Sequence, residues 1–218
     1  MIKLIIFDLD GTLIDAYTAI HQSINYTMVR LGYPRRGYAA VKKAVGWGDR
    51  ELLKGYVKNT DLKNALKIYR EHHRLALLKY AKLLPDVKIV LSRLKRTKYK
   101  LAVASNRPQK FSRILLRHLS IGRYFDFVLC GDQLVHGKPH PEILYRIMKK
   151  FNIPPSQTLY LGDMTVDVIA GNSAGVRTIA VLGGSSSLKE LKLKKPYRII
   201  KNISFLKEIL NQINVSRG

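Results

Sequence analysis

The sequence has little of several residue types, and each scarcity excludes a class of protein. It contains one cysteine, Cys130, so no disulfide can form within the chain and no CxxC metal site exists. No uninterrupted apolar run reaches roughly 18 residues, the length that a membrane-spanning helix needs. The N-terminus leads straight into a short apolar segment, without the cleavage site of a signal peptide. We therefore expect a soluble, cytoplasmic protein with no membrane partner, in which Cys130 is a buried core thiol.

Acidic residues are also scarce, with 15 Asp and Glu against 39 Lys and Arg and a net charge of +24. The basic excess is spread along the chain, although residues 93–98 and 189–198 form local basic clusters. No nucleic-acid-binding motif accompanies the charge, so the sequence does not favour a nucleic-acid partner. The positive field is instead expected to attract small anionic substrates.

The apolar residues alternate between strand-like runs and helical patterns, which predicts an α/β protein with a parallel sheet. At 218 residues and 46% hydrophobic content, the chain can bury a sizeable core. Strands are predicted at residues 4–7, 101–104, 127–129, 158–161, 178–181 and 197–200. Helices are predicted between and after them at residues 108–119, 141–151, 166–174 and 203–213.

The stretch between the first two strands is too long for a single crossover and has only helical patterns. Helices are predicted there at residues 16–31, 38–45, 50–57 and 62–83, with Asp49 as the N-cap of the third. We interpret residues 15–82 as a helical domain inserted into an α/β core made of residues 1–14 and 83–218. Two hinge strands, near Asp15 and Leu84, are expected to join the two domains.

Four short polar motifs follow the predicted strands in order. They are Asp8-Leu9-Asp10-Gly11-Thr12, Ser105-Asn106, Gly137-Lys138-Pro139, and the segment from Gly162-Asp163 to Asp167. Ligands of open α/β sheets bind outside the carboxyl ends of strands, so we expect these motifs to meet there. The residue types suit phosphoryl transfer, because one carboxylate can attack phosphorus, a second can move a proton, and several can hold Mg²⁺.

Together the four motifs resemble the haloacid dehalogenase superfamily, and residues 15–82 resemble its helical C1-type cap. The resemblance covers nearly the whole chain and implies a Rossmann-like parallel core with an all-helical cap. It implies that Asp8 is the nucleophile, Asp10 the general acid and base, and Lys138 a bridge between Asp8 and phosphate. Substrate binding is assigned to Thr12, Ser105 and the amide of Asn106. The implied Mg²⁺ ligands are Asp8, the Asp10 carbonyl and Asp163, with Asp167 in the outer shell.

Asp10 separates the activities within this superfamily. An alkoxide leaving group needs a proton and a halide does not, so an acid at this position argues against dehalogenation. The chain most resembles phosphoglycolate phosphatase-like hydrolases. We therefore expect a Mg²⁺-dependent phosphatase that hydrolyses a small phosphorylated metabolite through an aspartyl-phosphate. The alternatives are a β-phosphoglucomutase-like phosphomutase, a pyrophosphatase, a nucleotidase, or a basic nucleic-acid-binding protein on this fold; the chain is expected to be a monomer or dimer.

The glycine-rich loop at residues 45–50 lies between two predicted helices of the insert. In C1-capped relatives such a loop faces the active site, so Arg50 is predicted to pair with a second anionic group of the substrate. Trp47 is predicted to pack in a core or between the domains rather than to touch substrate. His21, in the first helix of the insert, is predicted to be a packing or helix-surface residue.

Overall fold

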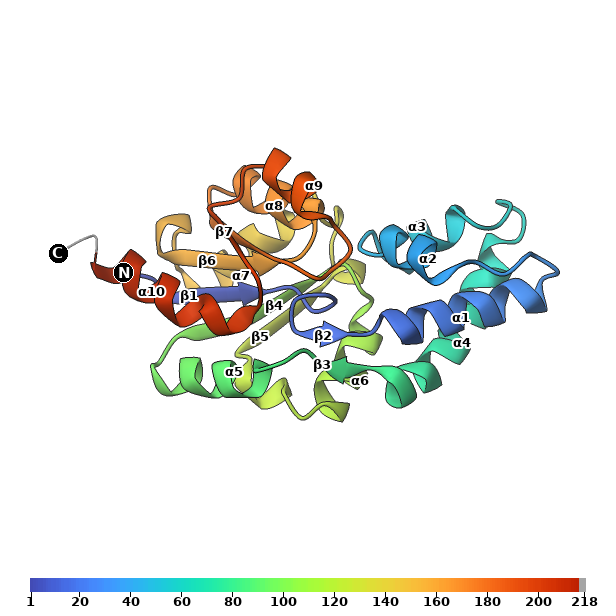
Figure 1. The fold of residues 1–218 in the computed structure, drawn as a ribbon, viewed down its shortest axis with the longest axis horizontal. Coiled ribbons are helices and arrows are strands. Elements are labelled where there is room, and N and C mark those ends of the chain that lie inside the picture. The colour runs from blue at the N-terminus through green and yellow to red at the C-terminus, as the bar shows by residue number, and fades with distance from the viewer. Residues whose placement is uncertain (216–218) are drawn as a thin grey trace.

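A computed structural model describes residues 1–215, and in it a six-stranded parallel sheet carries a helical extension at one end (Figure 1). The strand order is β5-β4-β1-β6-β7-β8. The strands are β1 (Leu4–Phe7), β4 (Lys100–Ser105), β5 (Phe127–Cys130), β6 (Thr158–Gly162), β7 (Arg177–Val181) and β8 (Arg198–Ile200). Every predicted strand is confirmed, with ends displaced by at most one residue. Cys130 is buried and its thiol is free, as predicted.

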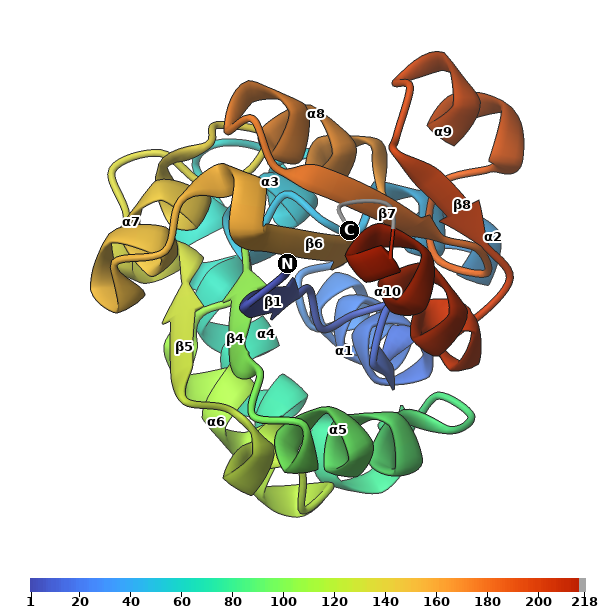
Figure 2. The same cartoon turned by 90° about the vertical axis from the view of Figure 1, so that its left-hand side faces the viewer.

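Helices cover both faces of the sheet because alternate residues of each strand point in opposite directions. In β1, Ile5 and Phe7 belong to an apolar cluster with one set of helices, and Leu4 and Ile6 to a cluster with the other. Figure 2 shows the two layers. The first set is α5 (Val87–Arg96), α6 (Gln109–His118) and α10 (Leu206–Val215); the second is α7 (Glu142–Phe151) and α8 (Thr165–Ser173). α9 (Leu188–Leu193) packs through Leu191 in a separate small cluster with Val168 of α8 and Ala180 of β7.

The order of the strands places β1 where the chain changes direction across the sheet. From β1 the chain continues to β4 and β5 on one side, and later to β6, β7 and β8 on the other. Crossover connections therefore leave in opposite directions from the neighbouring strands β1 and β6. Such a switch point opens a crevice at the carboxyl ends of the strands, which is where ligands bind in doubly wound sheets.

The segment between β1 and β4 forms the helical extension in Figure 1. Its helices are α1 (Tyr17–Arg30), α2 (Tyr38–Ala44), α3 (Asp49–Lys54) and α4 (Leu62–Tyr80), and they enclose an apolar cluster of their own. At the base, β2 (Ile14–Asp15) pairs antiparallel with β3 (Lys82–Leu83), where the chain leaves and re-enters the α/β part. Ala19 of α1 and Leu77 of α4 belong to the large core cluster, so these two helices are anchored on the sheet layer.

Several helix predictions need correction. The helix predicted to reach residue 83 ends at Tyr80, because Ala81 is extended and the next two residues form β3. The third helix ends at Lys54 rather than residue 57, and Gly48 rather than Asp49 is its N-cap. A 3-10 turn at Ile203–Phe205 precedes α10, where one helix was predicted.

Two helices, α5 and α9, were not predicted at all, and they include parts of the two basic clusters. Further 3-10 turns occur at Gly122–Tyr124, Gly131–Gln133 and Pro155–Gln157. Within residues 1–215, none of the helices combines the length and the apolar character needed to cross a membrane.

Candidate active site

The predicted motifs meet at the carboxyl edge of the sheet, at the switch point. Asp8 follows β1, Ser105 ends β4, and Asp163 follows β6. Lys138 comes from the loop between β5 and α7, and Asp167 from the first turn of α8. All five side chains are buried. Their convergence explains why four motifs that are far apart in the sequence each follow a strand of a parallel sheet.

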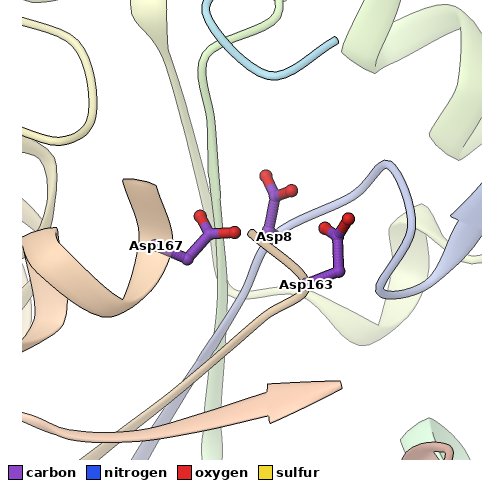
Figure 3. Close-up of side chains that lie close together, drawn as sticks. All are labelled: Asp8, Asp163 and Asp167. Carbon is purple, nitrogen blue, oxygen red and sulfur yellow. The ribbon is translucent and has the colours of Figure 1, made fainter. Parts of the chain in front are cut away.

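Three carboxylates form a cluster that fits a divalent cation. Oxygen atoms of Asp8, Asp163 and Asp167 all lie within 4.8 Å of one another, and Figure 3 shows the three side chains converging. Burial raises the pKa of Asp8 to about 7, with Lys138 opposing and Asp167 adding to the rise. Burial and the charges of Asp167 and Asp8 raise the pKa of Asp163 well above its usual value. A hard cation such as Mg²⁺ would offset this crowding, because it prefers carboxylate oxygens.

Lys138 places a positive charge beside the three clustered carboxylates. Its Nζ donates to Asp8 Oδ1 at 2.8 Å and to Asp167 Oδ1 at 2.7 Å, and it lies 3.1 Å from the hydroxyl of Tyr160. Tyr160 in turn donates to Asp167 Oδ1 at 2.6 Å. Burial alone would lower the pKa of Lys138, but the Asp167 and Asp8 carboxylates outweigh it and raise that pKa. Lys138 is therefore a fixed cation between two fixed carboxylates.

Asp163 sits in a cradle that only small neighbours permit. Its carboxylate accepts from the Ser185 amide at 2.9 Å, from the Tyr17 hydroxyl at 3.2 Å and from the Thr12 hydroxyl at 3.4 Å. A Cβ on Gly184 would lie only 1.7 Å from Asp163 Oδ2. Thr12 thus orients a candidate metal ligand. It is not among the residues that line the cavity at this edge of the sheet. Tyr17 belongs to α1, so the helical extension also contacts this carboxylate.

Asp10 faces the cavity but is held by an arginine that was not predicted. Arg107 Nη2 donates to Asp10 Oδ1 at 2.7 Å and to Oδ2 at 2.8 Å, and Nε donates to Oδ2 at 3.0 Å. Nη1 of the same guanidinium lies 2.7 Å from Nε2 of His73. Burial and the positive charge of Arg107 lower the pKa of His73 well below its usual range, so the ring is neutral and Nε2 accepts. Arg107 thus links Asp10 of the sheet edge with His73 of α4.

Ser105 and Asn106 lie at the cavity in different ways. The Ser105 hydroxyl accepts from the Arg107 amide at 3.3 Å. The Asn106 side chain joins three loops, since its Oδ1 accepts from the Lys138 amide at 2.8 Å and its Nδ2 donates to Gly46 O at 2.8 Å. The same Nδ2 lies 2.9 Å from Lys138 O. Asn106 therefore holds the Lys138 loop in place and ties it to the loop at residues 45–50.

The loop at residues 45–50 reaches the cavity through Val45, Asp49 and two glycines rather than through Arg50. Gly46, Gly48 and Asp49 line the cavity, whereas Arg50 is exposed and is not among the lining residues. Asp49 accepts two hydrogen bonds from Arg70, at 2.7 and 3.1 Å. Trp47 is 49% exposed, so the predicted core position is wrong, while packing between the domains stays a prediction. His21 packs within the extension, where Nε2 lies 3.0 Å from Arg36 O, in agreement with its predicted packing role.

The cavity at this edge of the sheet is small and partly open, and its lining is both polar and apolar. Its volume is about 50 Å³. Polar side chains of the α/β part line it: Asp8, Asp10, Ser105, Asn106, Arg107, Lys138 and Asp167. Apolar side chains come from both parts of the chain: Ile20, Val45, Leu52 and Tyr69 from the helical extension, and Phe111, Met164 and Val166 from the α/β part. The polar lining can bind an anion and a metal.

Sequence reasoning missed the residues that support the predicted ones. Tyr17, His73 and Tyr160 carry no motif signal, because each is recognised only from its contact with a distant residue. Arg107 directly follows Ser105-Asn106, so its position in the motif was a usable signal.

Known proteins that are similar to this chain agree with what the geometry of the site indicates. The sequence model of the family described as haloacid dehalogenase-like hydrolase matches residues 5–181. A phosphoglycolate phosphatase of Aquifex aeolicus is 31% identical over 203 residues, covering 91% of this chain and 95% of the relative. A phosphoglycolate phosphatase of Pseudomonas fluorescens is 30% identical over 217 residues, covering 94% and 78%.

A solved structure shows the likeness in three dimensions. It is described as a predicted phosphoglycolate phosphatase from Haemophilus somnus, and it superposes with a TM-score of 0.90 at 29% identity. The match covers 96% of this chain and 98% of that one. The six-stranded sheet and the helical extension are thus arranged alike in the two proteins.

Proposed function

This chain belongs to the haloacid dehalogenase-like hydrolase family, and on that premise we propose that it is a Mg²⁺-dependent phosphatase of a small phosphomonoester, through an aspartyl-phosphate on Asp8. The observation that carries the proposal is the arrangement of Asp8 and Asp10 at one cavity. Asp8 is fixed by Lys138 within a carboxylate cluster, and Asp10 faces the same space from two residues further on. Transfer of a phosphoryl group away from an alkoxide leaving group requires a nucleophile and a proton donor.

The steps follow from these side chains. Asp8 attacks phosphorus, the bond to the leaving oxygen breaks, and Asp10 gives that oxygen a proton. Asp10 then takes a proton from water, which attacks the aspartyl-phosphate and releases phosphate and free Asp8. Lys138 and Ser105, which line the cavity, bind oxygens of the phosphoryl group and stabilise its charge. Asp8, Asp163 and the Asp10 carbonyl would hold Mg²⁺, with Asp167 in the outer shell, and the bound ion would supply further charge stabilisation.

We infer that residues 15–82 act as a cap over the site. Ile20, Val45, Leu52 and Tyr69 of this segment line part of the cavity, and Gly46 O accepts a hydrogen bond from Asn106. The Lys43–Glu190 ion pair, at 3.2 Å, also links the segment to the core. Such closure would exclude water while the substrate is bound, and opening would release the products.

A phosphoglycolate-like substrate is supported by the cavity and by the relatives. Lys138, Arg107 and Ser105 line the cavity and suit a small anionic compound. Two similar proteins are named phosphoglycolate phosphatase. A phosphomutase, a pyrophosphatase or a nucleotidase is not favoured by these observations. The net charge of +24 would draw any phosphorylated metabolite toward the site.

The test of this function is phosphate release from a panel of phosphomonoesters, pyrophosphate and nucleotides. We expect release that stops when EDTA removes divalent cations and returns with excess Mg²⁺, with the highest kcat/KM for phosphoglycolate. Release that is indifferent to EDTA would remove the metal from the proposal. No release from any compound by folded protein would refute the phosphatase function.

Asp10→Asn tests the proposed proton transfers. We expect kcat for an alkyl phosphate to fall about 10²- to 10⁴-fold, the usual contribution of an acid or base. With p-nitrophenyl phosphate the leaving phenolate needs no proton, so the first step persists while hydrolysis of the aspartyl-phosphate slows. Rapid-mixing measurements should then show a burst of nitrophenolate close to the enzyme concentration. Steady-state turnover equal to that of the unsubstituted protein would exclude Asp10 from both transfers.

A further inference from the structure

Arg107 is a buried cation that the phosphoryl-transfer steps above do not use. Arg107 is 8% exposed, lines the cavity, and lies two positions after Ser105 in the sequence. We propose that Arg107 binds a second anionic group of the substrate, a carboxylate close to the transferred phosphoryl group. This inference rests on the proposed phosphatase function and specifies its substrate class.

The guanidinium lines the cavity and has at least one N–H group that its contacts with Asp10 and His73 do not use. It carries five N–H groups. Asp10 takes the Nε group and one or both of Nη2, and His73 takes one of Nη1, so at most four are in use within the described part of the chain. The planar fork of an arginine matches a carboxylate with two parallel hydrogen bonds. A carboxylate ligand can accept one hydrogen bond from the remaining N–H group, and two once Asp10 turns away from Arg107.

Both ends of the guanidinium are held before any ligand arrives. His73 is neutral, and its Nδ1 lies 3.1 Å from the Ser23 hydroxyl, so the ring is oriented from within α1 and α4. It fixes Nη1 without adding a second positive charge. The ring also stacks on Tyr69, with centroids 4.8 Å apart, and meets the edge of Phe111 at 5.1 Å. Arg107 is thus positioned jointly by the sheet edge and by the helical segment above it.

The second anionic group of the substrate also has a role in the contact between Arg107 and Asp10, because it can take the place of Asp10. To donate its proton to the leaving oxygen, Asp10 must turn away from Arg107 at least in part. A buried guanidinium that loses its carboxylate partner is strongly unfavourable. A substrate carboxylate can replace Asp10 at the same N–H groups, so one ion pair is exchanged for another. A substrate without such a group leaves Arg107 unpaired when Asp10 acts.

The exposed arginine of the loop at residues 45–50 cannot take this role in the structure. Arg50 is exposed and does not line the cavity, although the sequence favoured it for a second anionic group. Pro108 and Phe111, which follow Arg107 along the chain, line the cavity with it. The recognition site is therefore in the core, two residues beyond the phosphoryl-binding serine.

The experiment compares 2-phosphoglycolate with 2-hydroxyethyl phosphate, in which a hydroxymethyl group replaces the carboxylate. In the unsubstituted protein we expect kcat/KM to favour the carboxylated compound at least 100-fold. Arg107→Gln should lower that ratio at least tenfold, and Arg107→Lys should lower it less. Arg113→Gln, which changes an exposed arginine of α6, should leave the ratio unchanged. A purely structural Arg107 would reduce both activities and keep the ratio, which would overturn the proposal.

Binding to the Asp8→Asn variant makes the answer independent of turnover. Calorimetry with Mg²⁺ present should give at least tenfold tighter binding of 2-phosphoglycolate than of 2-hydroxyethyl phosphate, and Arg107→Gln in this background should abolish the difference. Equal affinities in Asp8→Asn itself would overturn the proposal even if every Arg107 variant failed to fold. If neither compound is hydrolysed but the preference in binding persists, the phosphatase function fails while the carboxylate site stands.

Discussion

Replacing Asp8 with asparagine is expected to lower kcat about 10⁶-fold, the order of loss seen when the nucleophile of an enzyme is removed. Asn keeps the size of the side chain and can still contact Lys138, whose Nζ lies 2.8 Å from Asp8 Oδ1. What it lacks is the anionic oxygen that attacks phosphorus. The measurement is single-turnover phosphate release with phosphoglycolate and Mg²⁺, at protein concentrations well above those of the substrate.

The same variant should remain folded, which separates chemistry from stability. Three buried carboxylates lie within 4.8 Å of one another, so neutralising one of them relieves repulsion when no cation is bound. We expect the Tm in EDTA to be unchanged or higher. Asp86→Asn is the matched control, because Asp86 is exposed and makes no capping hydrogen bond. Turnover of Asp8→Asn within tenfold of the unsubstituted protein would rule out covalent catalysis by Asp8.

The strands were predictable because a parallel sheet buries both of their faces. Leu4–Phe7 and Thr158–Gly162 are buried at every position, and such strands appear as uninterrupted apolar runs. α5 was equally readable, since Val87, Val90, Leu91 and Leu94 form one apolar face at helical spacing. Its basic residues drew the interpretation toward a charge cluster instead. Apolar spacing, rather than charge, was the informative pattern there.

Features that depend on distant pairing were beyond the sequence. Residues 82–83 continue the pattern of α4, but they are extended because they pair with Ile14 and Asp15. Arg50 was predicted to recognise an anion from its loop, yet the direction of the loop exposes it and brings Asp49 to the cavity. By contrast, the positions of Asp8, Ser105 and Asp163 could be predicted from the sequence, because each lies at the carboxyl end of a strand of the sheet.

The contact of Arg107 with His73 shows the same limit more sharply. Arg107 belongs to the loop after β4 and His73 to α4, and only the docking of α4 on the sheet layer brings them within 2.7 Å. No local pattern predicts that docking. The sequence therefore identifies the groups that react, whereas the packing of the helical segment decides which groups surround them.

Lys138→Met is expected to be the most destabilising single change at the site. The methionine side chain fills similar space but leaves Asp8 and Asp167 without the cation that contacts each at 2.8 Å or less. Removing one partner of a buried ion pair typically costs about 3–5 kcal/mol in the free energy of unfolding. For a chain of this size that corresponds to a fall in Tm of roughly 6–20 °C. Thermal unfolding in EDTA measures it, with Lys150→Met, on the exposed side of α7, as the matched control.

Two further measurements identify the cause of the loss. Adding Mg²⁺ should restore part of the Tm of Lys138→Met, since a cation that binds only the folded protein stabilises it. The double variant Lys138→Met/Asp167→Asn should also recover stability, because one of the two unpaired carboxylates is gone. Its activity should stay about 10²- to 10³-fold below that of the unsubstituted protein, as expected when a charge-stabilising donor is removed. A Tm of Lys138→Met equal to that of Lys150→Met would mean that the carboxylate cluster does not need this lysine for folding.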